Sequence, residues 1–173
     1  MELGRYLEID GRPAVRFERT YPHPVERVWA AISDPAELAH WFPSSVEIEP
    51  RAGGTMRFFD DPYAEGATGT VLAYDPPRRL AFTWRDDELR FDLEPVEPGS
   101  CRLVLTNLLS ERDTAARNAS GWTICLGELA KVVDGKPGDG AHSEANMSGF
   151  QPIFDAHVAA GLPSGAAVPD PRR

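Results

Sequence analysis

The side chains best suited to chemistry are scattered along this chain. Its four histidines, His23, His40, His142 and His157, have no metal-ligand spacing, and no HExxH motif occurs. No GxSxG motif, P-loop or dinucleotide fingerprint is present either. We therefore expect no metal, no cofactor and no catalytic residues. One enzymatic alternative stays open, in which Asn107 or a histidine in a pocket acts on a substrate.

Acidic side chains gather near the ends of expected strands. Carboxylates can serve acid–base catalysis, but a catalytic pair needs a buried member, and the sequence shows none. Carboxylates in turns between strands are ordinarily solvated. The residues interpreted in this way are Asp60, Asp61, Asp86, Asp87 and Glu88.

One polar residue interrupts an apolar strand face. Leu103, Leu105 and Asn107 alternate with other residues, so Asn107 falls on the face that turns inward. A buried amide needs a hydrogen-bond partner, either a ligand or a backbone group. Aromatic walls with a few polar groups are typical of sites for small apolar ligands. The residues predicted to line such a pocket are Trp41, Phe58, Trp84, Asn107, Asn118 and Trp122.

The elements that would position these residues begin with a strand and two short helices. After a polar entry, residues 14–21 alternate between apolar and polar side chains, as in a half-buried strand. Apolar residues then recur at helical spacing over 25–32, and Pro24 suits the start of that helix. A second helix start follows, where Asp34 can cap and Glu37 can reach back to the cap amide.

Six further strands are predicted, separated by turn signals such as Gly53-Gly54 and Pro98-Gly99. Their short, regular spacing predicts an antiparallel meander. One face of this sheet is apolar, so another element must cover it. The predicted strands span residues 46–49, 55–59, 68–74, 80–85, 89–96 and 102–109.

A long helix predicted over 112–133 supplies the cover, because its apolar residues form a single stripe. Its first half carries small side chains such as Ala116, Ala119 and Ser120. These leave either a void beneath the helix or close packing on large sheet residues such as Trp84. Both alternatives stay open at this point.

The composition changes after residue 133. Eleven of the forty residues from 134 to 173 are Gly or Pro, which is typical of a linker. Helical spacing returns over about 150–160. We therefore divide the chain into a domain over 1–135 and an extension over 136–173. The short helix would lie across the domain, close one end of the pocket or pack on another subunit, so a monomer and a homodimer are both open.

Charge and composition exclude several classes of function. The chain has 173 residues and a formal net charge of -9, which repels nucleic acid and anionic membranes. No apolar run is long enough to span a bilayer, and no signal or transit peptide is expected at the start. The two cysteines, Cys101 and Cys125, fit buried thiols in a reducing compartment. We therefore expect a cytoplasmic protein.

Five segments in this order resemble the START-like superfamily, also called SRPBCC, and in particular its activator-of-heat-shock-ATPase homologue branch. The resemblance covers about Pro13 to Gly135. Members often carry a histidine shortly before the Gly-Trp pair of the last helix, where this chain has Asn118 and Ser120. The segments are TYPHPVERVWAAISDPAELAHWFPSS, AGGTMRFFDD, GTVLAYDPPRRLAFTWRDD, LRFDLEPVEPGSCRLVLTN and SGWTICLGELAKVVDG.

The resemblance implies an α+β helix-grip fold, in which a curled antiparallel sheet of about six to seven strands surrounds the long C-terminal helix. It also implies a cavity between the sheet, this helix and the two short helices. Members of the superfamily bind lipids, sterols, polyketides or plant hormones, some are cyclases or hydrolases, and eukaryotic relatives stimulate a chaperone ATPase.

We therefore predict a binding protein for a small hydrophobic or aromatic ligand rather than an enzyme. The first alternative is a co-chaperone-like module of the stress response, whose partner is a chaperone. The second is an enzyme similar to polyketide cyclases or hydrolases.

Overall fold

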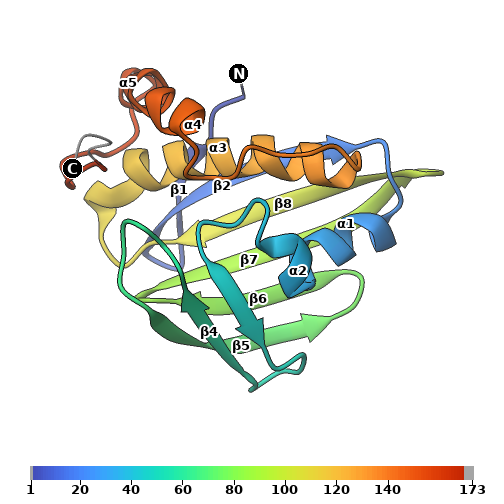
Figure 1. Cartoon of the computed structure of the whole chain (residues 1–173). Coiled ribbons are helices and arrows are strands. Elements are labelled where there is room, and N and C mark those ends of the chain that lie inside the picture. Colours follow the sequence, from blue (N-terminus) through green and yellow to red (C-terminus); the bar gives the residue numbers. More distant parts are fainter. Residues whose placement is uncertain (1, 170–173) are drawn as a thin grey trace.

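A computed structural model describes residues 2–169, in which one antiparallel sheet curls around a long helix (Figure 1). The eight strands follow the order β1-β2-β8-β7-β6-β5-β4-β3, so the first and third strands form the two edges. The strands are β1 (Arg5–Ile9), β2 (Arg12–Tyr21), β3 (Ser45–Ile48), β4 (Thr55–Phe59), β5 (Ala67–Asp75), β6 (Arg79–Trp84), β7 (Asp87–Glu97) and β8 (Ser100–Leu108).

The helices follow the predicted order. After β2 come α1 (Val25–Ser33) and α2 (Pro35–Leu38), and after β8 come a short 3₁₀ turn (Arg112–Thr114) and α3 (Ala115–Val133). The chain then adds α4 (Glu144–Ser148) and α5 (Phe150–Ala159). The predicted helix-grip fold is confirmed, and β1 makes the sheet one strand larger than the predicted six to seven.

The short helices are held partly as predicted. The Asp34 side chain accepts a hydrogen bond from the amide of Ala36 at 3.0 Å and so caps α2. Glu37 was predicted to reach back to the cap amide, and this is wrong. Its carboxylate instead accepts a hydrogen bond from Arg27 of α1 at 2.6 Å. A guanidinium is the stronger partner for a carboxylate, because both groups are charged.

Aromatic side chains fill the space between the short helices, the sheet and α3. The ring of Phe42 contacts Phe58, Phe82, Trp84 and Trp122, with centroids between 5.8 and 6.3 Å away. The indole of Trp41 is fully buried and donates to the carbonyl of Ala31 at 2.8 Å. Such rings dominate the energy of a core because each buries a large apolar area.

The small residues of α3 do not sit over a void. Ala115, Ala116 and Ala119 are fully buried, and the hydroxyl of Ser120 lies 3.2 Å from Nδ1 of His157 in α5. Ser120 therefore packs against α5, a contact that neither alternative considered for the sequence included.

Residues beyond α3 form the C-terminal extension (136–169), which returns along α3 and places α4 and α5 beside its N-terminal half (Figure 1). Buried Glu128 of α3 anchors the start of the extension. Its carboxylate accepts hydrogen bonds from the amides of Asp139 and Gly140 and from the side chain of Asn146, at 2.8, 3.1 and 3.0 Å. The extension is thus packed onto the rest of the chain.

His157 ties the end of the extension to the start of the chain. It is fully buried, and its Nε2 accepts a hydrogen bond from the amide of Gly4 at 3.1 Å. Its Nδ1 lies 3.0 Å from the carbonyl of Ile153. Since an amide only donates and a carbonyl only accepts, the geometry requires a neutral ring with its proton on Nδ1.

Candidate functional site

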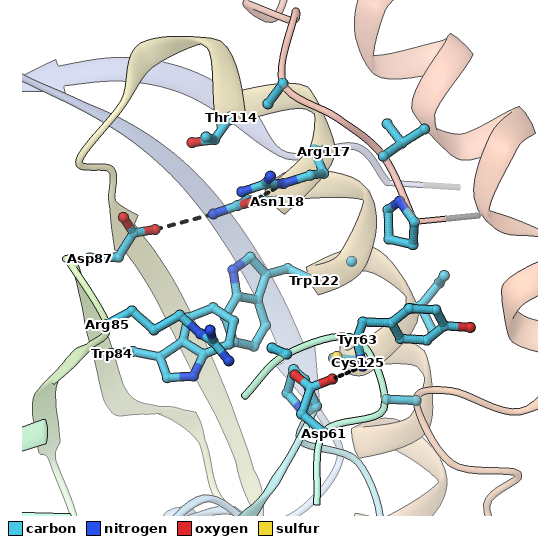
Figure 2. Close-up of a pocket in the computed structure, with 18 of the residues that line it drawn as sticks. Asp61, Tyr63, Trp84, Arg85, Asp87, Thr114, Arg117, Asn118, Trp122 and Cys125 are labelled. Atoms are coloured by element: carbon cyan, nitrogen blue, oxygen red, sulfur yellow. Dashed lines mark hydrogen bonds between the residues drawn. The ribbon is translucent and has the colours of Figure 1, made fainter. Parts of the chain in front are cut away.

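A cavity of about 730 Å³ lies beside the N-terminal half of α3, and part of it opens to solvent. One wall comes from the turn between β6 and β7 (84–87) and from the loop after β4 (61–64). A second wall is the face of α3 that carries Asn118, Trp122 and Cys125 (Figure 2). The third is the C-terminal extension, which contributes side chains such as Met147 and Phe150 and the segment 166–169.

Gly121 of α3 makes part of this space available. It lines the cavity, and a Cβ atom added to it would meet no atom within 4 Å. A larger residue at this position would therefore project into the cavity. The open space beside this half of the helix therefore lies on the Gly121 face, whereas the alanines are buried.

Asp87 is the centre of a polar network at the inner end of the cavity. Its Oδ2 accepts hydrogen bonds from the side-chain amides of Asn107 and Asn118 at 3.0 and 3.1 Å, and its Oδ1 accepts from the amide of Ser110 at 2.9 Å. Asn107 in turn accepts from the indole nitrogen of Trp122 at 3.1 Å. The network therefore fixes the orientation of Trp122 in the cavity wall.

Arg117 extends the same network toward solvent. Its Nε donates to Oδ1 of Asn118 at 3.1 Å, and its Nη1 lies 3.4 Å from the carbonyl of Ala167 in the extension. Figure 2 shows Arg117 and Asn118 on the same side of the cavity as Asp87. A guanidinium has five donors, so Arg117 retains donors for a further acceptor.

A histidine and a carboxylate face each other at the opposite wall. Nε2 of His142 donates to the carbonyl of Pro43 at 2.8 Å and lies 3.5 Å from Oδ1 of Asp61. The same Oδ1 accepts from the amide of Tyr63 at 2.8 Å, and the ring of Tyr63 lies 5.0 Å from that of His142. Buried Nδ1 of His142 has no hydrogen-bond partner within residues 2–169.

Three of the six residues predicted to line a pocket border this cavity. They are Trp84, Asn118 and Trp122. Asn107 lies one layer behind them, where its hydrogen bonds to Asp87 and Trp122 satisfy its amide. Trp41 and Phe58 lie in the core, at 0% and 2% exposure, and do not border the cavity.

Sequence reasoning missed several residues of this site. Asp87 was interpreted as a solvated turn residue, whereas Asn107, Asn118 and Ser110 surround its carboxylate. Arg85 and Arg117 were not predicted. Closure of one end of the pocket by the short helix of the extension was one of three alternatives, and side chains of the extension line the cavity. One available signal was the register of the sheet, because the predicted hairpin places Asp87 near the strand that carries Asn107.

The two cysteines are free and buried, as predicted. Cys125 borders the cavity. Burial strongly raises the pKa of its thiol, and the negative charge of Glu128 raises it further. Burial also raises the pKa of Cys101. Both are therefore protonated at neutral pH and unreactive. Over residues 2–169, no group of three or more His, Cys, Asp and Glu side chains is arranged to hold a metal ion.

Solved structures share this fold. CalU16 from Micromonospora echinospora is 24% identical, with a TM-score of 0.68, and the alignment covers 89% of this chain and 92% of CalU16. The protein encoded by BPP1335 from Bordetella parapertussis is 25% identical, with a TM-score of 0.69 and coverage of 96% and 94%. DynU16, a protein of the dynemicin biosynthetic locus, is 26% identical, with a TM-score of 0.63 and coverage of 72% and 48%.

Sequence comparison gives the family. No protein of curated function is similar enough in sequence to count as a relative. No helix within residues 2–169 has the length and apolar character needed to cross a membrane. The model of the Activator of Hsp90 ATPase homolog 1-like proteins matches residues 22–134, and the chain belongs to this family.

Proposed function

We propose that this protein binds a small hydrophobic or aromatic molecule in the cavity beside α3. The observation that supports this most directly is the cavity itself, whose 730 Å³ falls in the range of roughly 300–1,000 Å³ that small-molecule sites occupy. Half-buried Trp84 supplies aromatic surface and packs on nearly fully buried Trp122, with ring centroids 5.4 Å apart. The Asp87 network holds the polar groups of the wall in place, as a selective site requires.

One solved relative agrees with a small-molecule ligand. DynU16 belongs to a biosynthetic locus, where proteins meet small organic molecules. Among the described residues of the cavity wall, no two side chains have the geometry of a catalytic pair. Oδ1 of Asp61 and Nε2 of His142 lie 3.5 Å apart, and Nε2 already donates to the carbonyl of Pro43. We therefore favour binding over catalysis. The cytoplasmic location remains a prediction from the sequence.

The first experiment is native mass spectrometry on the gently purified full chain, followed by titration with the neutral fluorescent probe N-phenyl-1-naphthylamine. We expect either a co-purified small molecule or saturable binding of the probe. Gly121→Phe should weaken probe binding by about tenfold or more, because the ring occupies the cavity. Gly127→Phe is the matched control. It lies on the same helix, an added Cβ there also meets no atom within 4 Å, and it does not border the cavity.

Equal probe affinity in the two variants would contradict binding in this cavity. The family description refers to activation of a chaperone ATPase, so the alternative function is interaction with a chaperone. A chain that bound no small molecule but raised the ATPase rate of an Hsp90 chaperone would support that alternative.

A further inference from the structure

We propose that the ligand of this cavity is an aromatic acid, whose carboxylate is recognised by Arg85 and Arg117. This inference rests on the proposed function and specifies its ligand class. Both arginines border the cavity, and Figure 2 shows Trp122 between them in this view. A flat aromatic ring can lie against half-buried Trp84 while its acid group meets a guanidinium, which matches a carboxylate with two parallel hydrogen bonds.

The two arginines at the cavity differ from most others in their ion pairing. Most arginines of this acidic protein have a carboxylate within 4.0 Å; examples are Arg27, Arg57 and Arg102. Within residues 2–169, those without such a partner are Arg16, Arg85 and Arg117. Arg16 donates to the hydroxyl of Thr106 on the neighbouring strand. The two that remain are both at the cavity, although acidic residues are abundant nearby.

The carboxylates of the cavity wall have partners other than these two arginines or are exposed to solvent. Asp87 is occupied by three donors, and Asp61 accepts from the amide of Tyr63 and faces His142. The other acids of the wall, Asp86 and Glu111, are exposed, so solvent and salt screen their charge. The protein thus satisfies its nearby carboxylates with other groups and leaves guanidinium donors available.

Arg85 has a backbone conformation that is uncommon for a residue with a side chain. It is the first residue of the two-residue turn between β6 and β7, in which Trp84 pairs with Asp87. Its φ is 55°, in the left-handed region that glycine adopts without cost and that strains a residue with a side chain. Its one hydrogen bond within the described residues, from Nη2 to the carbonyl of Glu65 at 3.2 Å, is exposed. A two-residue hairpin turn requires a positive φ at this position and favours glycine there, so an arginine in this place points to a role for its side chain.

The test compares 2-naphthoate with 2-naphthamide, which have the same ring and differ in charge, by calorimetric titration of the full chain. We expect the acid to bind about tenfold tighter or more, as a charged hydrogen-bonded pair in a partly enclosed site provides. Arg85→Gln and Arg117→Gln should each weaken binding of the acid several-fold more than binding of the amide. Arg78→Gln is the control, because Arg78 pairs with Asp75 in an exposed turn away from the cavity.

Arg85→Gly separates recognition from folding. Glycine relieves the backbone strain, so the variant should melt at a higher temperature than the native protein and still lose preference for the acid. Equal affinity for acid and amide in the native protein would overturn the inference and leave the proposed function standing. Failure of both probes and of N-phenyl-1-naphthylamine to bind would overturn the proposed function together with the inference.

Discussion

Asp87 shows how a single side chain organises the cavity wall. The residue stands at the first position of β7, and its carboxylate gathers donors from β8, from the loop after β8 and from α3. Without this acceptor the amide of Ser110 would have no partner, and the side-chain amides of Asn107 and Asn118 would each keep a single acceptor. A group left without a partner costs roughly 1–3 kcal/mol. The orientation of Asn118 and, through Asn107, of Trp122 follows from this one acceptor.

Asp87→Asn tests this role. The new amide group presents hydrogens to donors that need an acceptor, so we expect the free energy of unfolding to fall by roughly 2 kcal/mol in urea denaturation. The tryptophan emission should shift as well, because Trp122 loses its fixed position. Asp86→Asn is the matched control. That neighbour is exposed and should change stability by less than about 0.5 kcal/mol, and an equal loss in both variants would argue against the network.

His157 makes stability depend on pH. Burial lowers its pKa below the ordinary value, although the hydrogen bond to the carbonyl of Ile153 opposes the shift. The unfolded chain therefore takes up a proton at a higher pH than the folded chain does. Stability is complete above the unfolded pKa of about 6.5 and falls as the pH drops below it, by at most about 1.4 kcal/mol per pH unit.

The measurement is the free energy of unfolding between pH 7.5 and 5 for the native protein and for His157→Gln. We expect the variant to be less stable at pH 7.5 and to show a shallower dependence on pH. His40→Gln serves as the control, because it removes a histidine whose side chain is exposed. Identical slopes for the native protein and His157→Gln would exclude His157 as the source.

Among the elements, the join between α3 and the C-terminal extension depends on Glu128. Burial alone would raise the pKa of this carboxyl, but hydrogen bonds from Lys131, Asn146 and the amides of Gly140 and Asp139 outweigh burial and lower it. The carboxylate is therefore charged at neutral pH and satisfies four donors at once. Removing it leaves the amides of Asp139 and Gly140 without a partner inside the join, whereas Lys131 and Asn146 each keep one other acceptor.

Glu128→Ala should weaken this join by roughly 2–4 kcal/mol, since it removes hydrogen bonds to a buried charge. Hydrogen–deuterium exchange should show faster exchange in residues 139–159 than in the strands. Glu144→Ala provides the comparison on α4, where the side chain is exposed. Unchanged exchange in residues 139–159 of the Glu128 variant would show that other contacts hold the extension.

The elements also show what the sequence could predict. Seven strands and the helices over 25–42, 112–133 and 150–160 follow from apolar periodicity and turn residues, because each buries one face. The edge strand β1 was missed because its residues are at most half-buried, although Asp10-Gly11 is a typical hairpin turn and adopts positive φ at both positions. The pocket was predicted less well, since periodicity cannot separate a wall residue such as Trp84 from a core residue such as Trp41.

At the scale of the whole molecule, the cavity belongs to two parts of the chain that the sequence seemed to separate. The matched family region supplies the walls from β6, β7, the loop after β4 and α3, and the extension supplies the third wall. The alignment with the Bordetella protein covers 96% of this chain and therefore includes most of the extension. The composition of a segment rich in Gly and Pro gives no sign of such a contact, because its docking depends on a few side chains such as Glu128 and His157.

The hydrogen bond between Gly4 and His157 has a consequence for the order of events during synthesis. The ribosome incorporates Gly4 long before His157, the residue whose ring accepts its hydrogen bond and which follows 153 residues later. The strands and α3 emerge first and can assemble while α5 is still being translated. The nascent chain thus passes through a stage in which the Ser120 side of α3 and one side of the cavity are uncovered, and translation of the last helix ends that exposure.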